Sequence, residues 1–142
     1  MNDWSVTQVV IRIEPQLATI SGMNVTHASF AGLDLLASAV LLIDEQLAIR
    51  YVNAAGENLL AVSSRAVIGK TLSAVCTCSA TLQGALNNGL LNNWGYTGQN
   101  VELKRSDGEV LHINCTVTPL RPDIAPGVRL LLELQPIQHH LA

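Results

Sequence analysis

The stretch LLIDEQLAIRYVNAAGENLL, residues 41–60, decides the fold of this chain. A short apolar run, Val40 to Ile43, leads into a polar turn, and a second apolar run, Ala48 to Val52, follows the turn. Two short strands joined by a polar turn predict a hairpin. Asn53 comes next, and asparagine caps helices by accepting hydrogen bonds from their first N–H groups. Ala54 to Leu60 is therefore predicted to be a short helix.

The residues after this stretch predict a block of helices. Ser63 or Ser64, and then Thr71, are suited to cap two more short turns of helix. Ser79 to Leu91 predicts the longest helix, because leucines recur there every four residues. These leucines are Leu82, Leu86 and Leu90.

The last third of the chain is predicted to be β. Asp107-Gly108 is a strong hairpin turn. Apolar and polar residues alternate after it from Leu111 to Val117 and again from Val128 to Leu134, which is typical of half-buried strands. Before it, one face of a strand is expected to carry Thr97, Gln99, Val101 and Leu103.

Strands separated by a block of helices indicate an α+β fold. We expect a five-stranded antiparallel sheet with helices on one face. A helix over Ala28 to Ala39 is predicted to precede it, because Phe30, Leu33 and Ala37 lie at helical spacing. We therefore predict an N-terminal extension at 1–27, the domain with its leading helix at 28–137, and the start of a linker to a downstream domain at 138–142.

Composition narrows the class of protein. Of the 142 residues, 49% are hydrophobic and 13% charged, which suits a packed core and excludes a disordered chain. The net charge of −3 argues against a nucleic-acid-binding surface. The longest apolar run, Phe30 to Ile43, is too short to span a bilayer, and no signal peptide precedes it. We expect a cytoplasmic protein that does not enter a membrane.

No catalytic or metal-binding constellation stands out. Cys76 and Cys78 are spaced C-x-C, Cys115 is distant, and no histidine completes a zinc set. Free thiols in the core are the simplest interpretation, and redox sensing or metal binding is the alternative. The chain itself is not expected to be an enzyme.

The order of elements and three stretches resemble the PAS family of sensory domains. They are residues 41–60, VIGKTLSAV (Val67 to Val75) and KRSDGEVLHINCTVTPL (Lys104 to Leu120). Within that family, SAVLLIDEQLAIRYVNAAGENLLAVSSRAVIGKTL and VRLLLELQPIQ resemble the N-terminal sensor domains of nitrogen-regulation histidine kinases of the NtrB type. The resemblance implies a downstream kinase domain, a response regulator as its target and control by a PII-type signal protein. His139 and His140 do not match the phosphoacceptor motif of such kinases.

The resemblance also locates a candidate ligand pocket between the sheet and the long helix. That helix contains no histidine for haem, and Asn114-Cys115 does not lie where flavin photochemistry requires a cysteine. No cofactor is expected, although flavin or a small metabolite is an alternative that would make the chain a ligand-binding sensor module. The residues expected there, all apolar, either line a pocket or fill the core: Leu82, Leu86, Leu90, Val101, Ile113 and Leu132.

The leading helix is the candidate dimer interface. It is apolar on more than one face, and a surplus apolar face often marks an interface. PAS domains of this type commonly form homodimers through such a helix, whereas the alternative is that it covers only its own sheet. The interface residues expected are Phe30, Leu33, Leu35 and Leu36.

Overall fold

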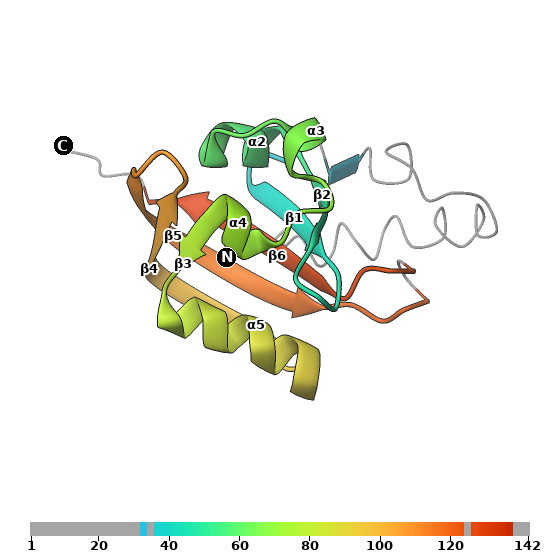
Figure 1. Ribbon diagram of the computed structural model, residues 1–142. Helices are drawn as coiled ribbons and strands as arrows, with labels where there is room; N and C mark the ends of the chain where they lie inside the picture. The colour runs from blue at the N-terminus through green and yellow to red at the C-terminus, as the bar shows by residue number, and fades with distance from the viewer. Residues whose placement is uncertain (1–31, 34–35, 124–125, 138–142) are drawn as a thin grey trace.

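The computed structural model describes residues 32–33, 36–123 and 126–137. They form one antiparallel sheet with helices on one side of it (Figure 1). The elements are β1 (Ala39–Ile43), β2 (Ile49–Val52), α2 (Ala54–Leu60), α3 (Ser64–Val67), α4 (Leu72–Val75), β3 (Cys76–Cys78), α5 (Ala80–Asn92), β4 (Tyr96–Arg105), β5 (Val110–Pro119) and β6 (Leu130–Pro136).

The α+β class and the antiparallel sheet are confirmed, but the sheet has six strands rather than five, in the order β2-β1-β6-β5-β4-β3. The additional strand is β3, in which Cys78 pairs with Leu103 and Cys76 with Arg105. Three residues are too few to show the alternation by which a strand is predicted from sequence. The first and last strands are neighbours, with Leu41 opposite Leu132.

The three helices α2, α3 and α4 begin directly after residues predicted to cap them, and α5 begins one residue after the predicted start at Ser79. Asn53 and Ser79 both accept a backbone N–H of the following turn, and they start α2 and α5. Ser63 and Thr71 stand at the N-cap positions of α3 and α4, but neither side chain makes a capping hydrogen bond.

The alternation predicted for β4 is wrong at its start. The register against β5 shifts between Gly98 and Val101, and Asn100 has a φ of 55° in the left-handed region. This bulge adds a residue, so Val101 is buried on the same side as Gly98 while Gln99 is exposed.

The predicted helix from Ala28 to Ala39 is wrong at its C-terminal end. Gly32 and Leu33 form a 3₁₀ turn, residues 36–38 are not helical, and Ala39 already belongs to β1. The remaining residues of this prediction, 28–31 and 34–35, lie outside the described part, as do 1–27 and 138–142.

Both faces of the sheet are apolar over β1 and β6. On one face, α2 to α5 pack against a core that includes Leu41, Leu132 and Leu134. On the other face, away from that core, four further side chains are at most 2% exposed. These are Val40, Leu42, Tyr51 and Leu131, which we call the second apolar face.

The buried amide of Asn53 joins the residues that precede β1 to the sheet. Asn53 is fully buried, and its Oδ1 accepts hydrogen bonds from the N–H groups of Val40 at 2.9 Å and Gly56 at 2.8 Å. Its Nδ2 donates to the carbonyls of Leu33 and Ser38, both at 2.9 Å. All four hydrogen bonds that an amide side chain can make are therefore formed.

A glycine allows this close packing. A Cβ at position 56 would lie 2.6 Å from Cγ2 of Val52 and 3.2 Å from Oδ1 of Asn53. Gly56 therefore lets the first turn of α2 approach the amide closely enough to donate to it.

Replacing Asn53 tests how much its hydrogen bonds contribute to the stability of the fold. Asn53→Ala leaves buried donors and acceptors of four backbone groups unpaired, so we expect the free energy of unfolding to fall by about 2–4 kcal/mol. Urea unfolding measures the loss. Asn58→Ala is the matched control, because Asn58 is exposed on the same helix. Equal midpoints for the two variants would contradict the role assigned to Asn53.

Candidate functional site

The residues predicted either to line a ligand pocket or to fill the core lie together between α5 and the sheet. All except Leu90 are at most 7% exposed and belong to the cluster between α5 and the sheet, and Leu90 packs against it. None of them lines either of the two hollows described below. The residues are Leu82, Leu86, Leu90, Val101, Ile113 and Leu132.

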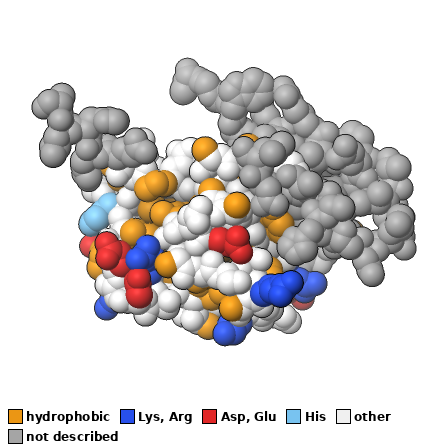
Figure 2. All heavy atoms as spheres, turned by 90° about the horizontal axis from the view of Figure 1, so that it is seen from above, with side chains coloured by type: hydrophobic (Ala, Val, Ile, Leu, Met, Phe, Trp, Pro, Cys, Tyr) orange, Lys and Arg blue, Asp and Glu red, His pale blue; other side chains and the backbone are white. Residues whose placement is uncertain are grey.

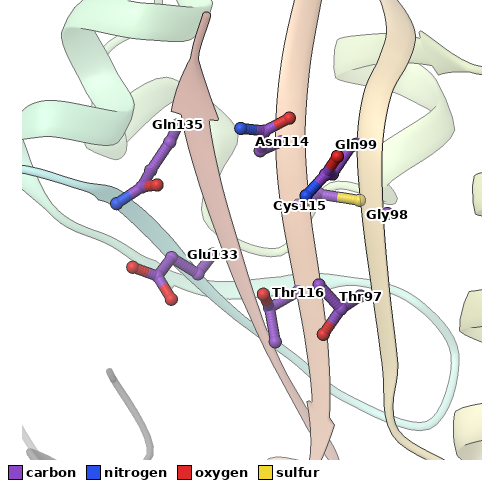
Figure 3. A pocket seen from close by; sticks show the side chains of 8 residues that line it. All are labelled: Thr97, Gly98, Gln99, Asn114, Cys115, Thr116, Glu133 and Gln135. Carbon is purple, nitrogen blue, oxygen red and sulfur yellow. The ribbon is translucent and has the colours of Figure 1, made fainter. Parts of the chain in front are cut away.

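The larger of these hollows lies on the sheet, across β4, β5 and β6, with a volume of about 210 Å³ (Figure 3). Thr97, Thr116 and Glu133 form one row across it, because they are direct partners in the register of the three strands. Asn114 and Gln135 form the next row. Most of the lining side chains are polar, and Gln99, Cys115 and Gly98 complete the lining.

Glu133 is the charged group of this hollow. It is half-buried, and desolvation raises the pKa of its carboxyl, although a hydrogen bond with Ser38 acts in the opposite direction. Ser38 also accepts a hydrogen bond of 2.7 Å from Nε2 of Gln135. Within 32–33, 36–123 and 126–137, no Lys or Arg forms an ion pair with Glu133. The hollow therefore offers acceptors to a donor or a cation.

Two of the four residues predicted for a dimer interface are described. The side chain of Leu33 is only 1% exposed and lies outside the helix-side core, whereas Leu36 is half-buried. Phe30 and Leu35 lie outside the described residues. Leu33 is thus buried within one chain, and the dimer interface stays a prediction.

Of the three cysteines, Cys115 lines this hollow, and Cys76 and Cys78 do not. Burial raises the pKa of Cys115 to about 11, so its thiol is protonated at neutral pH. Cys76 and Cys78 lie on the same face of β3, and each thiol shifts the pKa of the other. No group of three metal-binding side chains occurs among the residues that the structure describes.

Charges on the surface show no basic patch on the face seen in Figure 2. Lys and Arg side chains lie apart there, among acidic, uncharged and hydrophobic ones. Among the described helices, none is long and apolar enough to cross a membrane.

Sequence reasoning missed Glu133 and the second apolar face. A signal was present in LLLELQP, residues 130–136, where Leu131 occupies a position that the alternation assigns to solvent. An apolar residue at such a position indicates a strand that is buried on both faces.

Comparisons with known proteins agree with this arrangement. The family model described as the PAS fold matches residues 30–123. The sensory histidine kinase/phosphatase NtrB of Klebsiella oxytoca is 31% identical over 107 residues, which make up 75% of this chain and 29% of that protein. This chain therefore spans less than a third of that relative's length.

Solved structures show the same fold. The PAS domain of nitrogen regulation protein NR(II) from Vibrio parahaemolyticus is 28% identical, with a TM-score of 0.64, covering 75% of this chain and 95% of that one. A PAS domain from Colwellia psychrerythraea is 18% identical with a TM-score of 0.63, covering 80% of this chain and 98% of that one. The second likeness concerns the fold alone.

Shortening a core leucine distinguishes a filled core from a pocket. Leu86 is 1% exposed, so Leu86→Ala should lower the free energy of unfolding by about 2–5 kcal/mol. Leu91→Ala is the control on the same helix, because Leu91 is 81% exposed. Urea unfolding measures both. A loss no larger for Leu86→Ala than for Leu91→Ala would favour an open pocket instead.

Removing the charge of Glu133 should change how stability depends on pH. Because the pKa of Glu133 is raised in the folded chain, the folded state holds this proton more tightly than the unfolded state. The stability associated with the group is present below the unfolded pKa and is lost as pH rises through the folded pKa.

We therefore expect Glu133→Gln to unfold at a higher temperature than the unaltered chain at pH 8, and the difference to shrink at pH 4. Thermal unfolding across this range measures it, with the exposed Glu102→Gln as control. A constant difference at all pH values would mean that the carboxyl does not titrate as its burial requires.

Proposed function

The chain belongs to the PAS family, and we propose that it is the sensory and dimerisation domain of a nitrogen-regulation-type histidine kinase. The observation that carries the proposal is the 31% identity to NtrB, which extends over 75% of this chain. The 28% identity to the PAS domain of NR(II) supports the same assignment. A PAS domain is a sensory module, so catalysis would belong to a kinase domain elsewhere in the parent protein.

The partners follow from this proposal. A downstream kinase domain would receive the signal, a response regulator would be its target, and a PII-type signal protein would control it. The protein would act in the cytoplasm, without contact with nucleic acid or membrane.

The second apolar face supports a route for the signal. Its residues lie on β1, β2 and β6, and Asn53 ties the entry of the chain, through the carbonyls of Leu33 and Ser38, to the start of β1. We place the leading segment, residues 28–38, against this face, with Leu33 as its anchor. Phe30, Leu35 and Leu36 would then face the leading segment of a second copy.

β6 ends at Pro136, where the chain leaves the sheet. A change in how two leading segments pack on the sheet would reach β6 directly, because Leu42 of the second apolar face is opposite Leu131 in the register. The signal would leave the domain through residues 138–142 towards the kinase.

Sedimentation of the 142-residue chain tests the dimer. We expect a dimer, and we expect Leu36→Glu to weaken it by at least about tenfold, since a charge in an apolar interface costs well over 1.4 kcal/mol. Leu91→Glu is the control, because Leu91 is exposed on α5, which is not part of the proposed interface. A hybrid kinase extends the test: residues 28–137 replace the sensor domain of the Klebsiella oxytoca relative. In this hybrid, Leu36→Glu should lower autophosphorylation.

Circular dichroism establishes that each variant is folded. A chain that stays monomeric at the highest concentration measured, or a dimer that Leu36→Glu leaves intact, would contradict the interface. A hybrid kinase that is inactive although its chains are folded and dimeric would contradict the nitrogen-regulation assignment and leave the interface standing.

A further inference from the structure

β3 holds two thiols side by side at the edge of the sheet. Cys76 and Cys78 are two residues apart in an extended strand, so their side chains leave on the same face. Cys76 is 3% exposed, whereas Cys78 is half-buried and lines a hollow of about 170 Å³. One thiol is therefore open to a small solute, and its neighbour is not.

The two sulfurs are chemically unequal. A side-chain hydrogen bond with Cys76 lowers the pKa of Cys78, while the same bond, burial and the charge of Cys78 raise the pKa of Cys76. In the structure, the S–H of Cys76 donates to the carbonyl of Leu72 at 3.8 Å. Cys78 is therefore the more acidic thiol of the pair, and it is also the one that solvent reaches.

The hollow around Cys78 carries one charge of each sign, Lys104 and Glu102. Lys104 is opposite Thr77 in the register. Because the thiolate is the nucleophilic form of cysteine, the half-buried member of the pair is the reactive one.

We propose that Cys78 is a peroxide-reactive thiol and that Cys76 resolves its oxidised form into a Cys76–Cys78 disulfide. This site is independent of the function proposed above. The oxidant is a hydroperoxide such as hydrogen peroxide, and the reductant that reverses the step is a small thiol.

The first step transfers two electrons from sulfur to the peroxide. The thiolate of Cys78 attacks one peroxide oxygen, the O–O bond breaks, and the leaving hydroxide takes a proton to become water. Cys78 is left as a sulfenic acid.

The second step closes the disulfide. The sulfur of Cys76 attacks that of Cys78, the S–O bond breaks, and the hydroxyl leaves as water with the proton from Cys76. Oxidation of Cys78 itself favours this step, because it removes the negative charge that contributes to the raised pKa of Cys76. The buried thiol becomes easier to ionise once its neighbour has reacted.

The fold makes the disulfide strained and hence reversible. Residues two apart in an extended strand have Cα atoms roughly 6.6 Å apart, at the upper end of what a disulfide spans. Closing it must shorten β3, which lies at the edge of the described sheet and pairs with β4. Strained disulfides are the readily reduced ones.

The test treats the reduced full chain with hydrogen peroxide and digests it with trypsin. Cleavage after Lys70 and Lys104 gives peptide 71–104, which contains Cys76 and Cys78 but not Cys115. We expect this peptide to lose about 2 Da, the mass of the two thiol hydrogens, and to regain it with a small thiol. Cys115 is expected to remain reduced.

Three variants assign the roles. Cys76→Ser should keep the sulfenic acid on Cys78, where dimedone labels it, and Cys78→Ser should slow thiol loss by at least about tenfold. Cys115→Ser is the matched control and should oxidise like the unaltered chain. Because the peptide measurement needs no variant, the proposal stays testable where a substitution impairs folding.

Several results would overturn the proposal. A peptide 71–104 that keeps both thiols while Cys115 reacts would remove the site. Equal oxidation rates in Cys78→Ser and the unaltered chain would remove Cys78 as the nucleophile. Disulfides that only link two chains would remove Cys76 as the resolving thiol.

Discussion

The buried side chain of Asn53 is the constraint on which the rest of the domain depends. It pairs with backbone groups before β1, in β1 and in α2, so the stretch that leads into β1 and the start of α2 must meet at one point. A buried amide tolerates no partial arrangement, because each unmade hydrogen bond leaves a desolvated polar group. The backbone at Leu33 and Ser38 is thereby fixed relative to the sheet.

Much of the fold follows from local patterns. The hairpin after Val40, the cap at Asn53 and the turn at Asp107-Gly108 all follow from local chemistry, and all are present. The bulge at Asn100 and the strand at Cys76 could not be predicted in this way. Both are set by pairing with a distant strand, β5 for the first and β4 for the second.

The candidate site was less predictable than the fold. The leucines assigned to a pocket lie together as expected, because a helical repeat of four fixes their face, but the repeat does not indicate whether a space remains between them. Glu133 was missed since its surroundings, Thr97 and Thr116, come from two other strands. The three partner groups of Asn53 other than its cap were missed for the same reason.

The pairing of β1 with β6 bears on how the domain is made. β1 is buried along its whole length, and its neighbour β6 is the last strand of the sheet. During synthesis from the N-terminus, an apolar β1 and its partner β2 emerge long before β6 is available to cover them. The sheet can close only when nearly the entire domain has left the ribosome, so the nascent chain carries an exposed apolar strand until β6 emerges.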